Sequence, residues 1–296
     1  MQMKKVFNIL LGVSFIFLFI YLIRQEYIVP ELRSWPHLAL SILLLFGGFY
    51  ASTFSWKVAL RSHGMKHSQQ DALISHGLSV FAKYIPGKIW VILGRAGYLS
   101  PDRAGLKTRS FISLKEQLVY LWVGFLISAV PTVIFYGLKW ISLLVLLVIG
   151  GLTLFLFVGR VHRLSLKLLH RILKREIEVP LLTFREALPM IASVSLIWLC
   201  WTAGFWFFML AFSPDINPVM MFAFPLSVSL GLIAIILPGG IGLREGIIVG
   251  YLTLAGLDLE SATTISFMNR LWFIAGECFI FLLATGARIA GKRRDN

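Results

Sequence analysis

The sequence ILPGGIGLRE, residues 236–245, separates two strongly apolar runs of the chain. Proline removes a backbone donor and glycine weakens a helix, so some amides and carbonyls of this stretch lack intrahelical partners. Hydrocarbon tolerates such a break only where it is buried in protein or lines a polar cavity. Ionisable side chains at the same depth indicate a functional site. The stretch therefore predicts a broken helix, with a turn formed by Pro238, Gly239, Gly240 and Gly242 and with Arg244 and Glu245 facing the protein interior.

The composition around this stretch is that of a membrane protein. Of 296 residues, 58% are hydrophobic and 14% are charged, and the mean hydropathy is +0.82. These values lie far outside the range of soluble globular chains, and no region of domain size carries the charge needed to fold in water. We predict an all-α polytopic integral membrane protein, a single transmembrane domain over residues 1–296 without a separate catalytic domain.

The net charge of +14 does not indicate nucleic acid as a partner, because Lys and Arg lie mainly in a few loops and at both ends. That distribution is the positive-inside bias. It places both termini, including the basic tail 288–296, in the cytoplasm, and we expect a multi-pass protein of the plasma (inner) membrane.

Cys200 and Cys278 are interpreted as small core residues, and His63 and His67 as solvated loop residues. We predict no metal and no cofactor.

Six apolar runs are long enough to cross a membrane at ~20 residues per crossing. They cover about residues 6–23, 37–56, 114–136, 140–158, 188–211 and 262–285. The first run follows two lysines and has no small-residue cleavage site, so we interpret it as a retained span.

Residues 72–94 form a different kind of segment. Neither half is long enough to cross, and Pro86, Gly87 and Lys88 separate the halves. Because both flanks are basic, we predict a re-entrant hairpin that leaves the membrane on the side it entered. The alternative is an interfacial amphipathic segment with its tryptophan and lysines at the headgroups.

The two Pro-Gly turns indicate an internal repeat. At an offset of 152 residues, Pro86 and Gly87 fall on Pro238 and Gly239. The first repeat covers 1–137 with a re-entrant hairpin at 72–94, and the second covers 138–287 with a hairpin at 218–257. Three crossings in each copy would invert the second copy, an architecture typical of alternating-access transporters. If 218–237 is instead a full crossing, that parity is lost.

The segment 159–186 contains more Lys and Arg than Glu. Its basic residues recur at three- or four-residue spacing among leucines, which favours a basic amphipathic helix on the anionic inner leaflet. An ordinary positive-inside loop is the alternative.

Seven charged residues are candidates for binding a polar substrate. Half-helix N-termini favour anions, and arginine offers planar paired donors suited to phosphate. Arg270 and Glu277 are two helical turns apart and share one face. Alternatively, Lys88 and Arg95 are snorkelling interfacial cations and Glu116 is solvated near a span end. The full set is Lys88, Arg95, Glu116, Arg244, Glu245, Arg270 and Glu277.

Two motifs resemble signatures of the lysylphosphatidylglycerol synthase transmembrane-region family. PGGIGLRE at 238–245, followed by Gly256 and Arg270, is similar to its second signature, and IPGKIW at 85–90, followed by Glu116, to its first. The family includes the flippase portion of the multiple peptide resistance factor. The resemblance implies translocation of a polar lipid between leaflets, with Arg95, Glu116, Glu245 and Arg270 near the headgroup path. The resistance factor carries a soluble aminoacyl-transferase domain that is not found in this sequence, so synthesis of lysyl lipid is not implied.

The function predicted from these features is that of a flippase for a polar or anionic lipid, either aminoacyl-phosphatidylglycerol or a polyprenyl-phosphate-linked glycan. The expected partners are this lipid, the inner leaflet, a lipid- or glycan-synthesising enzyme and further copies of the chain. Two alternatives remain at this point. One is a membrane-embedded glycosyl- or phospho-lipid transferase, and the other is a non-catalytic anchor of an envelope-glycan assembly complex.

Overall fold

A computed structural model describes residues 31–85, 89–99, 105–173, 181–213, 216–234 and 238–294. All regular structure in these ranges is helical. The elements, with η for 3-10 helices, are α2 (Trp35–Ser62), α3 (Gln69–Ser79), η1 (Val80–Tyr84), α4 (Ile89–Tyr98), α5 (Gly105–Tyr136), α6 (Trp140–Phe157), α7 (Gly159–Leu173), α8 (Phe184–Phe212), η2 (Pro218–Phe222), α9 (Ala223–Ile233), η3 (Pro238–Gly240), α10 (Leu243–Leu254) and α11 (Leu259–Arg294). The predicted span 6–23 and the residues Pro86, Gly87 and Lys88 lie outside the described ranges.

Four described helices are long and apolar enough to span a membrane: α2, α5, α8 and α11 up to Gly291. The bent pair of α6 and α7 raises the number to five if it forms one span. Each of the four contains one predicted run, and the chain is an α-helical multi-pass membrane protein. The total of six spans and the inverted repeat stay predictions.

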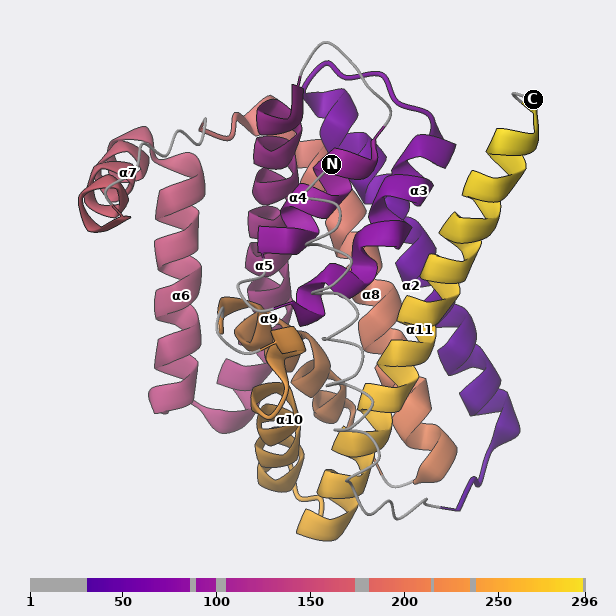
Figure 1. Ribbon diagram of the computed structural model, residues 1–296. Helices are drawn as coiled ribbons and strands as arrows, with labels where there is room; N and C mark the ends of the chain where they lie inside the picture. The colour runs from indigo at the N-terminus through magenta and orange to yellow at the C-terminus, as the bar shows by residue number, and fades with distance from the viewer. Residues whose placement is uncertain are drawn as a thin grey trace.

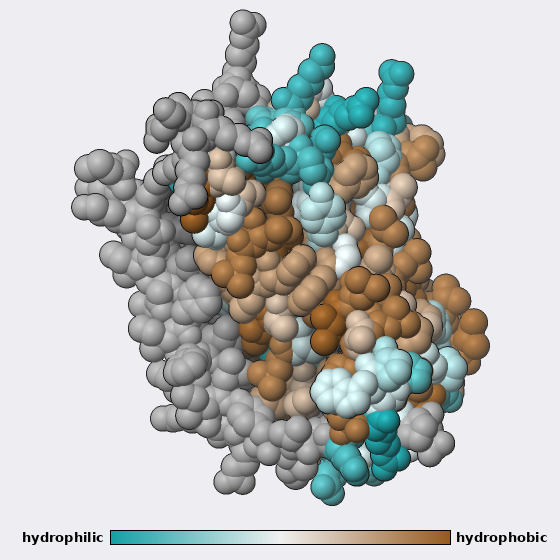
Figure 2. Space-filling model, turned by 90° about the vertical axis from the view of Figure 1, so that its right-hand side faces the viewer, coloured by the Kyte–Doolittle hydropathy of each residue, from teal (hydrophilic) through white to brown (hydrophobic). Residues whose placement is uncertain are grey.

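The outer surface agrees with this assignment. On the face seen in Figure 2, apolar side chains cover the middle and hydrophilic ones gather towards both ends. The helices α2 and α6 both begin towards the lower end of Figure 1. Their first residues are Trp35 and Trp140, each 73% exposed. Tryptophan is enriched where a membrane meets water, because its ring is amphipathic.

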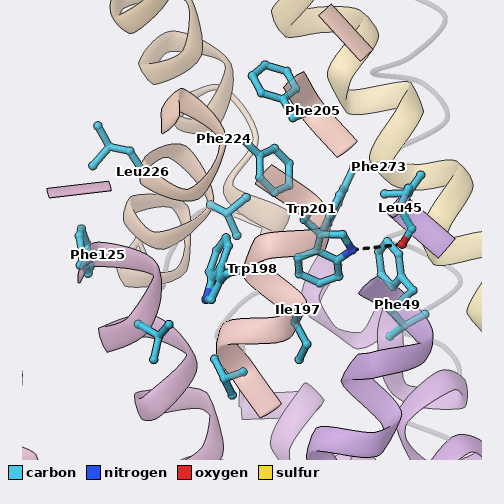
Figure 3. Packing of buried hydrophobic residues seen from close by; sticks show 14 of the residues in the cluster. Leu45, Phe49, Phe125, Ile197, Trp198, Trp201, Phe205, Phe224, Leu226 and Phe273 are labelled. Atoms are coloured by element: carbon cyan, nitrogen blue, oxygen red, sulfur yellow. Dashed lines mark hydrogen bonds between the residues drawn. The ribbon is translucent and has the colours of Figure 1, made fainter. Parts of the chain in front are cut away.

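The core is built around the packing of α2 on α8. Large aromatic rings of α8, α9 and α11 fill its centre, among them Trp198, Phe224 and Phe273 (Figure 3). A Cβ on Gly48 would lie 2.4 Å from the Trp201 indole, so this glycine lets the ring enter the α2–α8 interface. The indole Nε1 then donates to the Leu45 carbonyl at 3.2 Å. A closely packed aromatic core therefore supports the broken segments.

Two helical hairpins pack against this core. In the first, η1 follows α3 and α4 packs back on α3; in the second, η3 precedes α10, which packs back on α9. Figure 1 shows α3 and α4 in the upper half and α10 at the lower end. The turns η1 and η3 contact each other. Opposed hairpins are what an inverted repeat requires.

Over its described residues, 218–234, the run predicted at 218–237 does not form one long helix. Its helical part, η2 and α9, ends at Ile233 and is shorter than the described spans. A helix of that length is below the ~20 residues needed for a crossing, so this finding favours the hairpin alternative. Whether each hairpin is re-entrant in a bilayer stays a prediction.

Candidate functional site

The contact between η1 and η3 brings the two helix breaks together. Gly239 has a φ of 59°, a backbone conformation that side chains with a Cβ rarely adopt. A Cβ at this position would lie 2.6 Å from the ring of Tyr84, so the ring packs directly on the glycine backbone. The Gly239 carbonyl accepts a hydrogen bond from Arg270 Nη1 at 3.2 Å. The break predicted at Pro238 to Gly242 is therefore a meeting point of three elements.

Glu277 of α11 is fully buried beside this meeting point. Its carboxylate forms an ion pair with Lys83 of η1 and accepts a hydrogen bond from the Tyr84 hydroxyl at 2.8 Å. Lys83 and Tyr84 were not among the residues predicted from the sequence. The available signal was a lysine within an apolar stretch, three residues before a helix-breaking proline, where a charge must face the protein interior.

Glu245 of α10 is held by two different groups. One carboxylate oxygen lies 3.5 Å from Arg270 Nη1, and the other accepts from the Gly242 amide at 2.7 Å. The latter bond satisfies a free amide at the start of α10, as in other N-terminal caps. Arg270 is therefore the ion-pair partner of Glu245, although Arg244 is its neighbour in the chain.

Arg244 is the least compensated charge of this group. Its side chain is 6% exposed and packs along Gly231 and Gly240, with the guanidinium 5.0 Å above the Phe273 ring. Its Nε and Nη2 atoms have no hydrogen-bond partner among the described residues. A buried donor without a partner is destabilising, so these two atoms are available to an acceptor that enters the site.

We call the group Lys83, Tyr84, Arg244, Glu245, Arg270 and Glu277 the central cluster. Its side chains lie within electrostatic range of one another. Three cations face two carboxylates, so among the described residues Arg244 is left without an ion-pair partner. A site of this kind favours an anion, because the added charge balances the excess and uses the free donors.

A second buried ion pair lies between Arg95 of α4 and Glu116 of α5, 2.5 Å apart. The Arg95 guanidinium lies 4.5 Å from the Trp56 ring, and Ser55 donates to Glu116 at 2.9 Å. Arg95 is 1% exposed and Glu116 4%. Neither a snorkelling Arg95 nor a solvated Glu116 is therefore correct. The span begins at Gly105 rather than near 114, so Glu116 lies three turns inside the helix.

His76 of α3 lies between the two charged groups. It is within electrostatic range of Arg95 and of Lys83, and its Nε2 atom is 2.8 Å from the Ser52 hydroxyl. Arg109 of α5 holds α4 in place by donating to the carbonyls of Ala96 and Leu99 at 3.2 and 3.3 Å. His76 is thus a polar side chain of α3 within electrostatic range of both charged groups.

His63 corrects a prediction. It was expected in a solvated loop, but its Nδ1 atom donates to the Ala59 carbonyl at 2.8 Å and its Nε2 atom lies 3.0 Å from Lys115 Nζ. Glu186 lies 3.8 Å from the same imidazole. Burial lowers the pKa of His63. The prediction was wrong because α5 is long and brings Lys115 to the end of α2.

Within the described ranges no three His, Cys, Asp or Glu side chains are grouped to hold a metal ion.

Of the seven predicted binding residues, four lie in the central cluster: Arg244, Glu245, Arg270 and Glu277. Arg95 and Glu116 form the second pair, and Lys88 lies outside the described residues. A sequence model of the family described as lysylphosphatidylglycerol synthase TM region matches residues 6–275. This range includes the Arg95–Glu116 pair and all of the central cluster except Glu277. A search of curated proteins returned no match.

Proposed function

The chain belongs to the lysylphosphatidylglycerol synthase transmembrane-region family, and we propose that it moves a lipid with an anionic headgroup between the leaflets of a membrane. The observation that carries the proposal is Arg244, buried with two unpaired donors in a cluster that has one excess positive charge. A phosphate group fits this place, because guanidinium donors bind phosphate oxygens in a planar, paired geometry.

The surroundings of Arg244 favour a lipid over a small soluble anion. A lipid keeps its acyl chains in hydrocarbon while its headgroup needs a polar interior. The central cluster offers that interior between two helix breaks, and the outer faces of the surrounding helices are apolar. Both a phosphodiester, as in aminoacyl-phosphatidylglycerol, and a polyprenyl-phosphate-linked glycan carry the required anion.

Movement of the headgroup requires the buried ion pairs to open in turn. Removing one partner of a buried pair costs about 3–5 kcal/mol. A phosphate that approaches Arg270 or Arg95 replaces the carboxylate and keeps the guanidinium paired, so the exchange is much less costly than simple separation. The two breaks meet at the central cluster, and small motions of α4 and α10 against the closely packed aromatic core would expose it to either side.

Translocation in proteoliposomes tests the proposal. Purified protein is reconstituted with fluorescent phosphatidylglycerol, its lysyl ester or a polyprenyl-phosphate sugar, and the accessible fraction is followed by reduction of the fluorophore from outside. We expect faster translocation than in empty liposomes for at least one of these lipids, with slower movement of a diacylglycerol glycolipid, which lacks phosphate. Equal rates for all lipids in protein-containing and empty liposomes would contradict the proposal.

The same samples separate transport from chemistry. The assay is run with and without divalent metal, and the lipids are then extracted and their masses measured by mass spectrometry. A transporter returns every lipid with its mass unchanged. A lipid with an added or lost group would assign the protein to the transferase class instead.

A further inference from the structure

The helix α7 presents an exposed apolar and basic surface outside the charged interior. The helix α7 follows α6 after a bend of 100°. Figure 1 shows it at the upper end of α6, turned away from the α6 axis. We propose that α7 lies flat on the membrane surface and binds anionic phospholipid headgroups, so that it fixes the depth of the α6 end in the bilayer.

The bend between the two helices is held by specific contacts. The buried imidazole of His162 is hydrogen-bonded through Nδ1 to the Phe155 carbonyl at 3.0 Å. The same imidazole packs on the Phe155 ring, with centroids 4.8 Å apart. Phe155 belongs to the last turn of α6 and His162 to the first turn of α7. A corner closed in this way keeps α7 roughly perpendicular to α6, and therefore parallel to the membrane plane when α6 crosses it.

The side chains of α7 have the pattern of an interfacial helix. Leu164 and Leu168 share one face and are 69% and 58% exposed. The basic residues on the adjoining face are exposed as well: Arg160, Arg163, Lys167 and Arg171. No Asp or Glu occurs between Gly159 and Leu173. The helix therefore offers an exposed apolar face and four exposed cations to the same partner.

Charge complementarity identifies this partner as an anionic lipid surface. Leucines enter the boundary between headgroups and acyl chains, while Lys and Arg remain at the phosphates. The nearby Phe184, at the start of α8, is 74% exposed and provides a further interfacial anchor. Each Lys or Arg near such a surface favours docking by about fivefold.

Labelling measures the docking directly in the full-length protein. Cys200 and Cys278 are replaced by alanine, and an environment-sensitive fluorophore is attached to Leu164→Cys. The protein is reconstituted in vesicles of phosphatidylcholine alone or mixed with phosphatidylglycerol, both with and without a spin-labelled quencher lipid. We expect a blue-shifted, lipid-quenched emission in the mixed vesicles and a weaker effect in phosphatidylcholine.

A charge variant separates the lipid surface from other occupants. Arg163→Gln, Lys167→Gln and Arg171→Gln together should weaken docking by about a hundredfold and remove the difference between the two vesicle types. The matched control is Lys57→Gln, Arg61→Gln and Lys66→Gln, which removes three cations elsewhere and should leave the emission unchanged. Emission from a water-exposed label in both vesicle types would overturn the proposal. The proposal would also be overturned if the label were shielded from water in a way that depends on protein density rather than lipid charge, because a second copy of the chain would then cover α7.

Discussion

The aromatic ring of Tyr84 packs on the backbone of Gly239, and this contact joins the two helix breaks of the molecule. The residues are 155 positions apart in a chain of 296 residues. The Tyr84 hydroxyl reaches Glu277, and the Gly239 carbonyl receives Arg270. One contact therefore aligns the side chains of the central cluster, and its loss should disturb all of them together.

We expect Gly239→Ala to destabilise the protein, because a Cβ would lie 2.6 Å from the Tyr84 ring at a φ of 59°. The left-handed conformation alone costs about 1–2 kcal/mol for a residue with a side chain. Tyr84→Ala in the same chain should recover the part caused by the clash. Gly246→Ala in α10 is the control, since a Cβ there meets nothing within 4 Å. Thermal unfolding in detergent compares these three variants with the wild type, and a Gly239→Ala variant as stable as Gly246→Ala would be inconsistent with the contact.

The pair of Lys83 and Glu277 should behave as a coupled buried ion pair. Glu277→Gln or Lys83→Met alone leaves a buried charge without its partner and should cost about 3–5 kcal/mol. The double variant should be less destabilised than the sum of the two single variants, because no uncompensated charge remains. Denaturant unfolding of the four proteins completes the cycle. Additive effects would mean that the two side chains do not interact.

Arg109 should control the order of α4. It donates to two carbonyls near the end of that helix, and hydrogen bonds to charged groups contribute about 1.5–3 kcal/mol each. We expect Arg109→Gln to accelerate amide hydrogen exchange over residues 89–98, with partial recovery in Arg109→Lys. The exposed neighbour Lys107→Gln is the control. Unchanged exchange in Arg109→Gln would show that α4 is held by other contacts.

Acid should weaken the protein through His63. Burial lowers the pKa of this imidazole, so the folded state keeps it neutral while the unfolded chain takes up a proton near pH 6.5. The contribution of His63 to the free energy of unfolding is therefore fully present above about pH 6.5. It falls as the pH drops through that value and levels off below the pKa of the folded state. His63→Gln should flatten the dependence of the melting temperature on pH, and His67→Gln should not. A wild-type curve that is unchanged by His63→Gln would assign the acid sensitivity to other groups.

The sequence was sufficient for the features that depend on local composition. Long apolar runs predicted α2, α5, α8 and α11 because a bilayer admits only helices of about that length. The Pro-Gly turn at 238–239 predicted the break before α10, whereas Pro86 and Gly87 lie outside the described residues. Arg270 and Glu277 were predicted to face the protein interior because charged residues in an apolar span are unfavourable in contact with lipid, and both side chains are buried.

Pairings between distant residues could not be read in the same way. Glu277 finds its cation 194 positions earlier, at Lys83, and no periodicity within either segment specifies that contact. Arg270 rather than Arg244 pairs with Glu245 because α11 packs along α10, which depends on the tertiary arrangement. Glu116 and His63 are buried because α5 begins at Gly105, earlier than predicted. Helix ends are difficult to place from sequence.

The most direct measurement of the central claim is lipid translocation by Arg244→Gln. This change removes the positive charge and two unpaired donors but keeps a polar side chain beside Gly231 and Gly240. The exposed Arg61→Gln is the matched control, and both proteins are first shown to unfold at the wild-type temperature or above. We predict that Arg244→Gln falls to the rate of empty liposomes while Arg61→Gln keeps the wild-type rate. Translocation by a folded Arg244→Gln protein at the wild-type rate would contradict the proposed headgroup site.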